Sequence, residues 1–399
     1  ATGYGALKAN TTGARNIAIG RNALDGPDTE NDNLAIGYDA LGGAIAGGEY
    51  NVAIGNYSLD ANTLGDNNVA LGYAALTGNT TGSNNTALGY TALQANTTGS
   101  ANIAVGQGAL ENNTTAISNV AVGNGALEKN TTTSYNSAFG AYALNKNTAG
   151  SNNVAVGYQA LYASTTAGFN SAVGANSLSN NTTGTSNTSM GYNSLQLNRT
   201  GDYNAAFGAS AMEKTTTGEM NVAIGNEALT ANTSGDFNTA TGYQALYKST
   251  TASSNTAIGY KSLLELTTGV DNTAIGYASG DVLTTGGSNV LLGNQTDPSA
   301  ANGTNQIVIG QGATGHGNNI AVIGNGSATA IHPHDDNEVD LGSSSYEYKN
   351  LYVDGVAYLD GIGMGSTAMT LPTADGSNGQ VLQTNGSGTL AWASASSAS

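Results

Sequence analysis

Cysteine is absent from this 399-residue chain, only 9% of its residues are charged and 6% are aromatic, and proline occurs 4 times. Without cysteine, a disulfide scaffold, a thiol nucleophile and a cysteine-ligated zinc site are excluded. Large apolar side chains are too few for the two or three ordinary globular domains that this length would allow. No apolar run reaches the length of a membrane-spanning helix, so we expect no membrane insertion.

The net charge is −17, from 27 acidic and 10 basic residues. The basic residues are scattered instead of forming a stripe, so nucleic acid is not an expected partner. An acidic surface that keeps a long particle soluble is sufficient reason for this charge.

Glycine supplies 57 residues, and one glycine in each repeat, mostly after Ala and an aliphatic residue, recurs every 17 positions. One step of 18 residues separates Gly37 from Gly55, and a last step of 14 leads from Gly310 to Gly324. The unit reads Asn-x-Ala-aliphatic-Gly-Tyr-x-Ala-Leu-x-x-Asn-Thr-Thr-Gly-x-x. Seventeen residues rich in Gly and Thr do not hold two helices, so the period predicts one coil of a parallel β-solenoid, or β-roll.

Each coil is predicted to hold one strand in Asn-x-Ala-aliphatic-Gly-Tyr and a second strand centred on Ala-Leu. Coils stacked in register lie about 4.8 Å apart, so identical residues form columns along the axis. An Asn column then hydrogen-bonds amide to amide, and aliphatic columns pack without voids. The predicted core columns are Ile19, Ile36, Ile54, Leu71, Leu88, Val105, Val122 and their successors, and Leu24, Leu41, Leu59, Leu76, Leu93, Leu110 and Leu127.

Such a core is thin for a free-standing rod. Because strand side chains alternate between faces, aliphatic residues that point inward would turn small Ala and Gly outward. A smooth outer face of this kind lets another backbone approach closely. We therefore predict an all-β fibre in which the chain associates with copies of itself as a homotrimer.

Three regions are expected along the chain. Residues 1–326 form the solenoid shaft, 327–360 form a neck with a short β segment, and 361–399 form a tail rich in Gly, Ser and Thr. Alternation from Gln380 to Trp392 predicts a hairpin within the tail.

The Asn-x-Ala-Ile-Gly repeat resembles the β-roll heads of trimeric autotransporter adhesins, although those heads usually have shorter units. The stretches Asp340-Leu-Gly-Ser-Ser-Ser-Tyr and Leu371-Pro-Thr-Ala-Asp-Gly are similar to segments near the C-terminus of bacteriophage tail fibres. The resemblance implies a non-enzymatic virion tail fibre that attaches to a host cell-surface receptor, with a glycan as one class of receptor. The alternatives are the head or stalk of a bacterial surface adhesin and an extracellular matrix fibre.

His332 and His334 flank Pro333 and are two residues apart, so on an extended strand they face the same way. Around a three-fold axis, two imidazoles from each chain would ligate a transition-metal ion, as His-x-His elements do in the phage fibre tips that the segment resembles. The alternative is an ordinary exposed turn beside Asp335 and Asp336. No other cofactor is expected.

A tyrosine follows the repeat glycine in several coils. Tyr243, Tyr260 and Tyr277 are therefore candidate glycan contacts, and the alternative is that their rings simply cover neighbouring coils. Adjacent threonines such as Thr80 and Thr81 raise ice binding as a further alternative, but on a strand they would point to opposite faces. Acidic residues fall at variable positions and no Ser-His-Asp arrangement is suggested, so we predict no catalytic residues.

Overall fold

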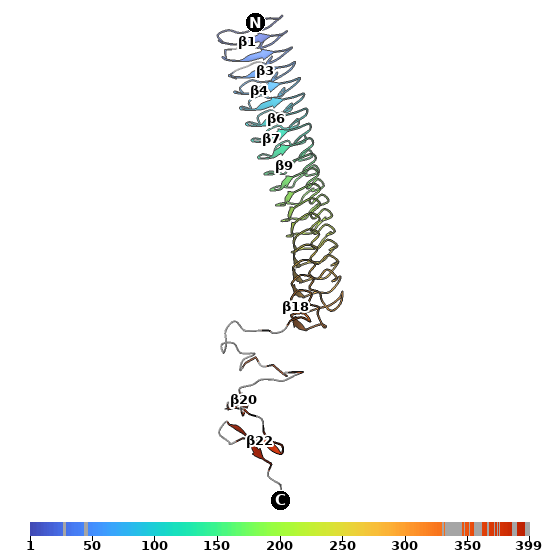
Figure 1. Cartoon of the computed structure of the whole chain (residues 1–399). Coiled ribbons are helices and arrows are strands. Elements are labelled where there is room, and N and C mark those ends of the chain that lie inside the picture. Colours follow the sequence, from blue (N-terminus) through green and yellow to red (C-terminus); the bar gives the residue numbers. More distant parts are fainter. Residues whose placement is uncertain are drawn as a thin grey trace. The chain divides into compact units, whose positions relative to one another are not determined.

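The computed structural model of the chain is an all-β parallel solenoid of about 18 turns, followed by short antiparallel hairpins (Figure 1). Two compact units are present, Ala1–Thr329 and Ala330–Ser399. The residues described are 1–26, 29–43, 47–328, 331, 345–346, 348–350, 352–354, 361–364, 367–370, 372, 374, 376–384 and 389–395. Among them no helix is long and apolar enough to cross a lipid bilayer.

Nineteen three-residue strands form one sheet in the first unit. They are β1 (Ile17–Ile19), β2 (Leu34–Ile36), β3 (Val52–Ile54), β4 (Val69–Leu71), β5 (Thr86–Leu88), β6 (Ile103–Val105), β7 (Val120–Val122), β8 (Ser137–Phe139), β9 (Val154–Val156), β10 (Ser171–Val173), β11 (Thr188–Met190), β12 (Ala205–Phe207), β13 (Val222–Ile224), β14 (Thr239–Thr241), β15 (Thr256–Ile258), β16 (Thr273–Ile275), β17 (Val290–Leu292), β18 (Ile307–Ile309) and β19 (Ala321–Ile323).

Every strand pairs in parallel with the strand of the next coil, in strict register. Val69 of β4 lies opposite Thr86 of β5, and Ala70 lies opposite Ala87. One circuit of the backbone is therefore one 17-residue repeat, and the predicted β-solenoid is confirmed. In Figure 1 the strands succeed one another along one side of the stack.

The described residues of the second unit include two hairpins. Strands β20 (Gly361–Met364) and β21 (Thr367–Thr370) pair antiparallel, as do β22 (Gln380–Thr384) and β23 (Leu390–Ser394). The second of these pairs occupies the segment for which alternation predicts a hairpin.

The Ala-Leu segment of each coil is a run of turns, so the prediction of a second strand there was wrong. Ala74 and Leu76 both have left-handed backbone, with φ of 53° and 54°. Such values are uncommon for residues with a side chain and interrupt an extended strand. The stack stabilises this conformation, because the Leu76 N–H donates a 2.9 Å hydrogen bond to the Ala92 carbonyl of the next coil.

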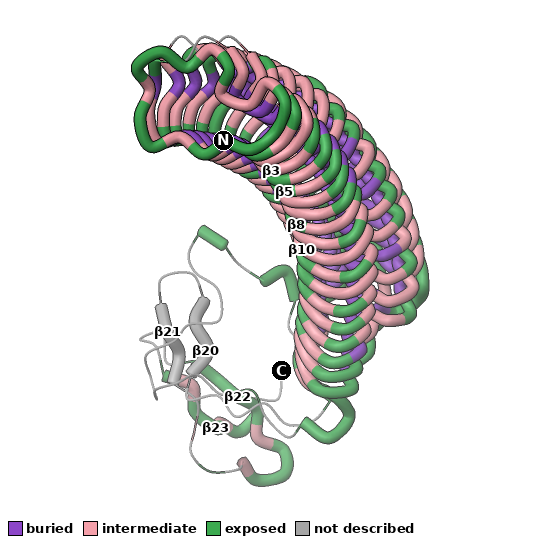
Figure 2. The backbone as a smooth tube through the Cα atoms, turned by 90° about the horizontal axis from the view of Figure 1, so that it is seen from above, coloured by how far each residue is buried: buried purple, intermediate pink, exposed green. Residues whose placement is uncertain are grey.

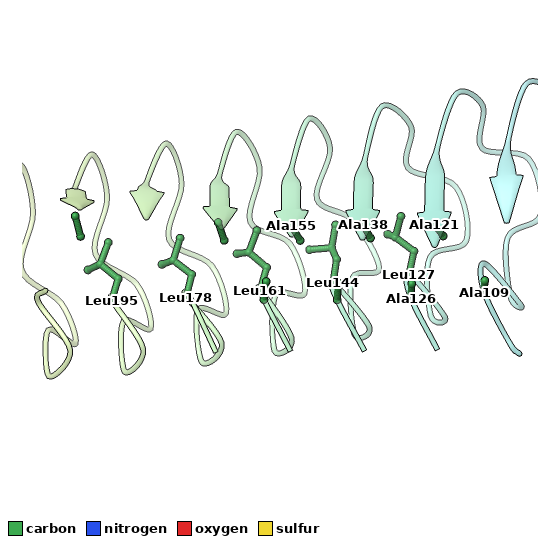
Figure 3. Packing of buried hydrophobic residues seen from close by; sticks show 14 of the residues in the cluster. Ala109, Ala121, Ala126, Leu127, Ala138, Leu144, Ala155, Leu161, Leu178 and Leu195 are labelled. Carbon is green, nitrogen blue, oxygen red and sulfur yellow. The ribbon is translucent and has the colours of Figure 1, made fainter. Parts of the chain in front are cut away.

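The orientation of the strands is opposite to the prediction. The central alanine of a strand is buried, as Ala70 is with no exposed surface, while its neighbour Leu71 is 42% exposed. The column of aliphatic residues before the repeat glycine was therefore wrongly assigned to the core. The Leu24 to Leu127 column and its successors supply most of the large core side chains, and these point toward the strand alanines (Figure 3). Near the end of the shaft, Leu266, Leu283, Leu291 and Val308 add to the core from other positions.

The interior volume explains this orientation. A leucine and two asparagine amides fill most of each coil, so the strand opposite them has room only for a methyl group. One of the coils that depart from the pattern also compensates for the change. Gly280 replaces the core leucine, and Leu291 of β17 replaces the strand alanine. A Cβ added to Gly280 would lie 2.6 Å from the Leu291 Cδ1, so the larger strand side chain occupies the space that leucine leaves.

The repeat glycine is required by the neighbouring coil. Gly72 has a φ of 140°, a region that residues with side chains rarely adopt. A Cβ at this position would lie 2.4 Å from the Gly89 carbonyl oxygen, so any other residue would push the coils apart.

A buried asparagine column binds the coils together where each strand begins. Asn68 has no exposed surface, and its backbone N–H donates to the Asn51 Oδ1 at 3.0 Å. Its Nδ2 donates to the same Oδ1 at 3.2 Å and to the Gly82 carbonyl at 2.9 Å. The column is unbroken from Asn16 to Asn289 and forms the predicted amide ladder. Figure 2 shows buried residues recurring at the same place in successive coils.

A second asparagine column lies at the Asn-Thr-Thr corner. The Asn79 Nδ2 donates to the Asn62 Oδ1 and to the Gly82 carbonyl, each at 2.9 Å. The Gly82 carbonyl thus accepts from both columns and joins them. Because these amides are fully buried, each unmade hydrogen bond would cost about 1–3 kcal/mol.

The second column is interrupted, and the interruptions leave polar atoms unpaired. Ser164, Thr215 and Ser249 replace asparagine. Within the part of the chain that the structure describes, their buried hydroxyls have no hydrogen-bond partner, and neither does the Asn198 Oδ1 one coil before Thr215. These coils are therefore local weak points of the stack.

We predict that Thr215→Asn stabilises the solenoid by about 1–2 kcal/mol, because the introduced amide supplies the donor that Asn198 lacks and removes an unpaired hydroxyl. Urea unfolding followed by circular dichroism measures the change. The matched control is Thr217→Asn at an exposed position of the same corner, which should leave stability unchanged. An unchanged or lower stability for Thr215→Asn would show that the ladder does not limit this coil.

Candidate functional site

The outer face of the 19-stranded sheet carries two columns of outward residues, of which the one before the repeat glycine is apolar except at Thr241, while the other includes seven serines and threonines. Because the alanine at the centre of each strand points inward, the residues on either side of it point outward. Ile103 is 41% exposed and Ile224 is 44% exposed, although both belong to strands. The large exposed apolar residues of this face are Ile17, Ile19, Leu71, Leu88, Ile103, Phe139, Val154, Met190, Phe207, Ile224, Ile258, Ile275, Ile307 and Ile323.

Aromatic residues extend this outer face at both margins. On one margin, just before the buried asparagine, Tyr135, Phe169 and Phe237 have left-handed backbone and are more than half exposed. On the other margin, the tyrosines that follow the repeat glycine, such as Tyr73 and Tyr90, are about half exposed. The apolar band is therefore wider than the strands themselves.

The dimensions of the outer face compare with those of protein interfaces. Nineteen strands at about 4.8 Å give a length of about 85 Å, and three extended residues give a width of about 10 Å, or about 850 Å², of which the apolar column takes about half. Soluble monomers rarely expose contiguous apolar patches above a few hundred Å². A standard interface buries about 800 Å² on each partner. The outer face is thus our candidate association surface, and it differs from the smooth Ala and Gly face that the sequence suggested.

The three tyrosines predicted as glycan contacts lie together in one stack. The ring centroids of Tyr243 and Tyr260 are 5.4 Å apart, and those of Tyr260 and Tyr277 are 5.0 Å apart, with nearly parallel planes. The Lys261 ammonium lies 5.2 Å from the Tyr260 centroid. No sugar ring fits between rings at this spacing, so these tyrosines would meet a glycan at their edges or at the ends of the stack.

His332 and His334 lie outside the described residues, and the metal prediction stays a prediction. Among the residues that are described, no group of three or more His, Asp or Glu side chains is arranged to hold a metal ion. His316 lies in the last coil and lines a hollow of about 440 Å³ beside Val322 and Ile323.

Threonines of the Asn-Thr-Thr corner bond to the next coil. The Thr80 hydroxyl donates to the Thr97 carbonyl at 3.0 Å, and Thr97 in turn donates to Thr114 at 3.0 Å. These hydroxyls take part in the stack, and their neighbour Thr81 is exposed. The ice-binding alternative requires a flat array of free threonine hydroxyls, which this pattern does not favour.

Carboxyl groups gather near the C-terminal end of the shaft. Burial raises the pKa of Asp297 to about 6, and the neighbouring Asp281 adds to the shift. The Asp297 Oδ1 is buried and has no hydrogen-bond partner within the described part of the chain. Burial, with a contribution from Glu265, also raises the pKa of Asp281. These groups are better explained as a local cost of the irregular last coils than as acid-base machinery.

No family model matches the chain, and no curated protein matches its sequence. The sequence did not reveal that the aliphatic side chains before the repeat glycine point outward, and no signal within one repeat indicates it.

We predict that the last coils are more stable at pH 4 than at pH 6.5. The folded pKa of Asp297 is about 6 and its ordinary value is 3.8, so between these values the folded chain binds more protons than the unfolded chain. The stabilisation is present below about pH 4 and is lost as the pH rises through 6.

Amide hydrogen exchange in residues 290–313, corrected for intrinsic rates, measures this effect. Asp297→Asn should abolish most of the pH dependence, and Asp271→Asn, at an exposed carboxyl, should retain it. Equal pH dependence in wild type and Asp297→Asn would contradict the assignment.

Proposed function

We propose that the chain is a non-enzymatic structural segment of a homotrimeric fibre that attaches a particle to a cell surface, most closely a bacteriophage tail fibre. The observation that carries the proposal is the apolar column on the outer face, which continues from β1 to β19 on a rod whose interior is closed by its own hydrogen bonds. Exposed isoleucine, valine and leucine do not stabilise a rod of this kind unless another surface covers them.

A second copy of the same chain is the occupant that fits best. Both partners then carry coils at the same spacing of about 4.8 Å, so side chains of one copy fit between those of the other along the whole length. Three copies around one axis also extend the contact to the margin just before the buried asparagine, because each copy meets a different neighbour on each side. Tyr135 and Phe169 on that margin would then be partly buried, while the margin of tyrosines that follow the repeat glycine stays accessible.

The attachment role is supported by the separation of two sets of residues. Asn, Ala, Leu and Gly positions maintain the coil, while exposed positions of the turn segment after the core leucine carry diverse residues such as Ala61, Lys129 and Leu197. A rigid shaft with a variable surface suits presentation of recognition sites at a distance from a particle. The similarity of the C-terminal stretches to tail fibres, noted above, favours a virion location over a bacterial adhesin.

Lysine substitutions on the outer face test lateral association. We predict that the native chain has a mass of three times 39.6 kDa, and that the double variant Ile224→Lys with Ile275→Lys falls to the mass of one chain. Both isoleucines are over 40% exposed in the single chain, so the coil itself should fold. Native mass spectrometry measures the change.

The matched control is Thr217→Lys with Thr268→Lys, in which each lysine lies seven residues earlier at an exposed corner. It should keep the trimer mass. A wild-type chain that is monomeric, or a double isoleucine variant that stays trimeric, would contradict the proposed assembly.

Attachment is tested separately, with labelled trimer and a panel of bacterial cells. Saturable binding to some strains and not to others is expected. Absence of binding to every strain would contradict the attachment role, while the trimer mass would still support a structural fibre.

A further inference from the structure

A hollow of about 300 Å³ lies on the side of the shaft, away from both ends. Four consecutive coils line it. The residues that define it are Tyr90, Gly108, Glu111, Gly125, Glu128 and Tyr142.

The hollow exists because two neighbouring coils lack an aromatic ring at one position and any side chain at the next. After the repeat glycine, where Tyr73 and Tyr90 carry rings, the next two coils carry Gln107 and Asn124. One residue further on, both coils have glycine, Gly108 and Gly125, with φ of 64° and 60°. These four substitutions together leave an open space in the tyrosine column.

Other interruptions of the tyrosine column do not produce the same arrangement. Ala175 also replaces tyrosine, but Asn176 follows it, and Asn226 is followed by Glu227. Only in the coils of Gly108 and Gly125 do loss of the ring, two glycines and two successive glutamates coincide within the regular shaft.

Aromatic rings close the hollow along the axis. Tyr90 stacks on Tyr73 with centroids 5.4 Å apart and an interplanar angle of 11°, so its other face is directed toward the coil of Gln107. Tyr142 stands at the opposite end, where a Cβ added to Gly125 would lie 3.0 Å from its ring. Three coil spacings separate the two tyrosines, or about 14 Å.

Glu128 is held in a fixed position. Its Oε1 pairs with the Lys129 Nζ at 2.6 Å, and its Oε2 accepts from the Asn145 Nδ2 at 3.0 Å. Asn145 also donates to the Gly125 carbonyl at 2.7 Å, which ties the glutamate to the glycine floor. A preorganised carboxylate of this kind loses little entropy when it accepts a ligand hydroxyl.

Glu111 lies one coil before Glu128 and, unlike Glu128, its carboxylate is not held by polar groups of the shaft. Within the described residues its carboxylate forms neither an ion pair nor a side-chain hydrogen bond. Its Oε2 lies 3.3 Å from the position of a Cβ on Gly108, so it extends over the bare backbone of the hollow. Both glutamates therefore present acceptor oxygens between two aromatic walls.

We propose that this hollow binds one unit of a non-anionic glycan. The apolar face of the sugar ring packs on Tyr90, and its hydroxyls, or an amide or ammonium group, donate to Glu111 and Glu128. Lys129 pairs with Glu128 but leaves one of the two negative charges uncompensated, and this charge, that of Glu111, repels acidic sugars. The inference depends on the proposed attachment function and names the receptor chemistry of one site on the shaft.

The arrangement favours binding over hydrolysis. Burial acts to raise the pKa of Glu128, but hydrogen bonds from Lys129 and Asn145 outweigh it and hold the pKa below the ordinary value. A glycosidase requires a carboxylic acid that stays protonated to donate to the leaving group. Glu128 is ionised and already paired, so it accepts hydrogen bonds and does not donate a proton.

Saturation-transfer NMR with the intact chain tests the site. The probes are the methyl glycosides of glucose, galactose, N-acetylglucosamine and glucosamine, with methyl glucuronide as the anionic comparison. We expect transfer to at least one of the first four and none to the glucuronide. Transfer to none of the four, stronger transfer to the glucuronide, or cleavage of a bound glycoside would overturn the inference.

Variants distinguish the hollow from the rest of the shaft. Gln107→Tyr restores the ring found in neighbouring coils, so it should fold normally, fill the hollow and reduce transfer at least fivefold. Glu111→Gln keeps the shape and should weaken binding about tenfold, because it removes one charge-assisted acceptor. Undiminished transfer in either variant would overturn the site.

Glu213→Gln is the matched control, because Glu213 occupies the same repeat position as Glu111 without a neighbouring glutamate or glycine pair. It should bind sugar as the wild type does, and a comparable loss would show that the effect is not local. If cells bind the fibre but no sugar does, only this inference fails. If neither binds, the attachment role fails as well.

Discussion

The whole shaft depends on one constraint, which is that buried asparagine amides of successive coils must hydrogen-bond to one another. From Asn33 to Asn289 each amide is at most 1% exposed, and its partners are the backbone and amide of the coils on either side, as at Asn51, Asn68 and Gly82. A shift in register would leave all of them unpaired in an interior that excludes water. The period, the strict parallel pairing and the requirement for glycine at the corner follow from this ladder.

The same constraint makes the interior narrow. Once a leucine and two amides occupy the coil, the strand contributes only an alanine methyl group, and the large aliphatic residues must lie outside. The exchange of Gly280 and Leu291 shows that the interior volume is conserved even where the residues change. The residues that hold one coil together are therefore different from those that would hold one rod to another.

This division leaves the surface free to vary without loss of the fold. Tyrosines stack at 5.0–5.4 Å along part of the shaft, or give way to smaller residues elsewhere. Four small changes between Gln107 and Gly125 are enough to open a hollow between two rings. A repetitive rod can in this way carry a local recognition site without a dedicated domain, because each coil contacts mainly its neighbours.

The sequence by itself determined the 17-residue circuit, the asparagine ladder and the leucine core column, because each follows from a repeat in which like residues must lie over like. It also indicated that the two sides of each strand differ, but not which side faces inward. Alternation separates Ala70 from Leu71 without assigning either to the core, and a left-handed Leu76 is not visible in a motif. Only closure of the coil decided these points, because the space left opposite the strand depends on every other side chain in the same circuit.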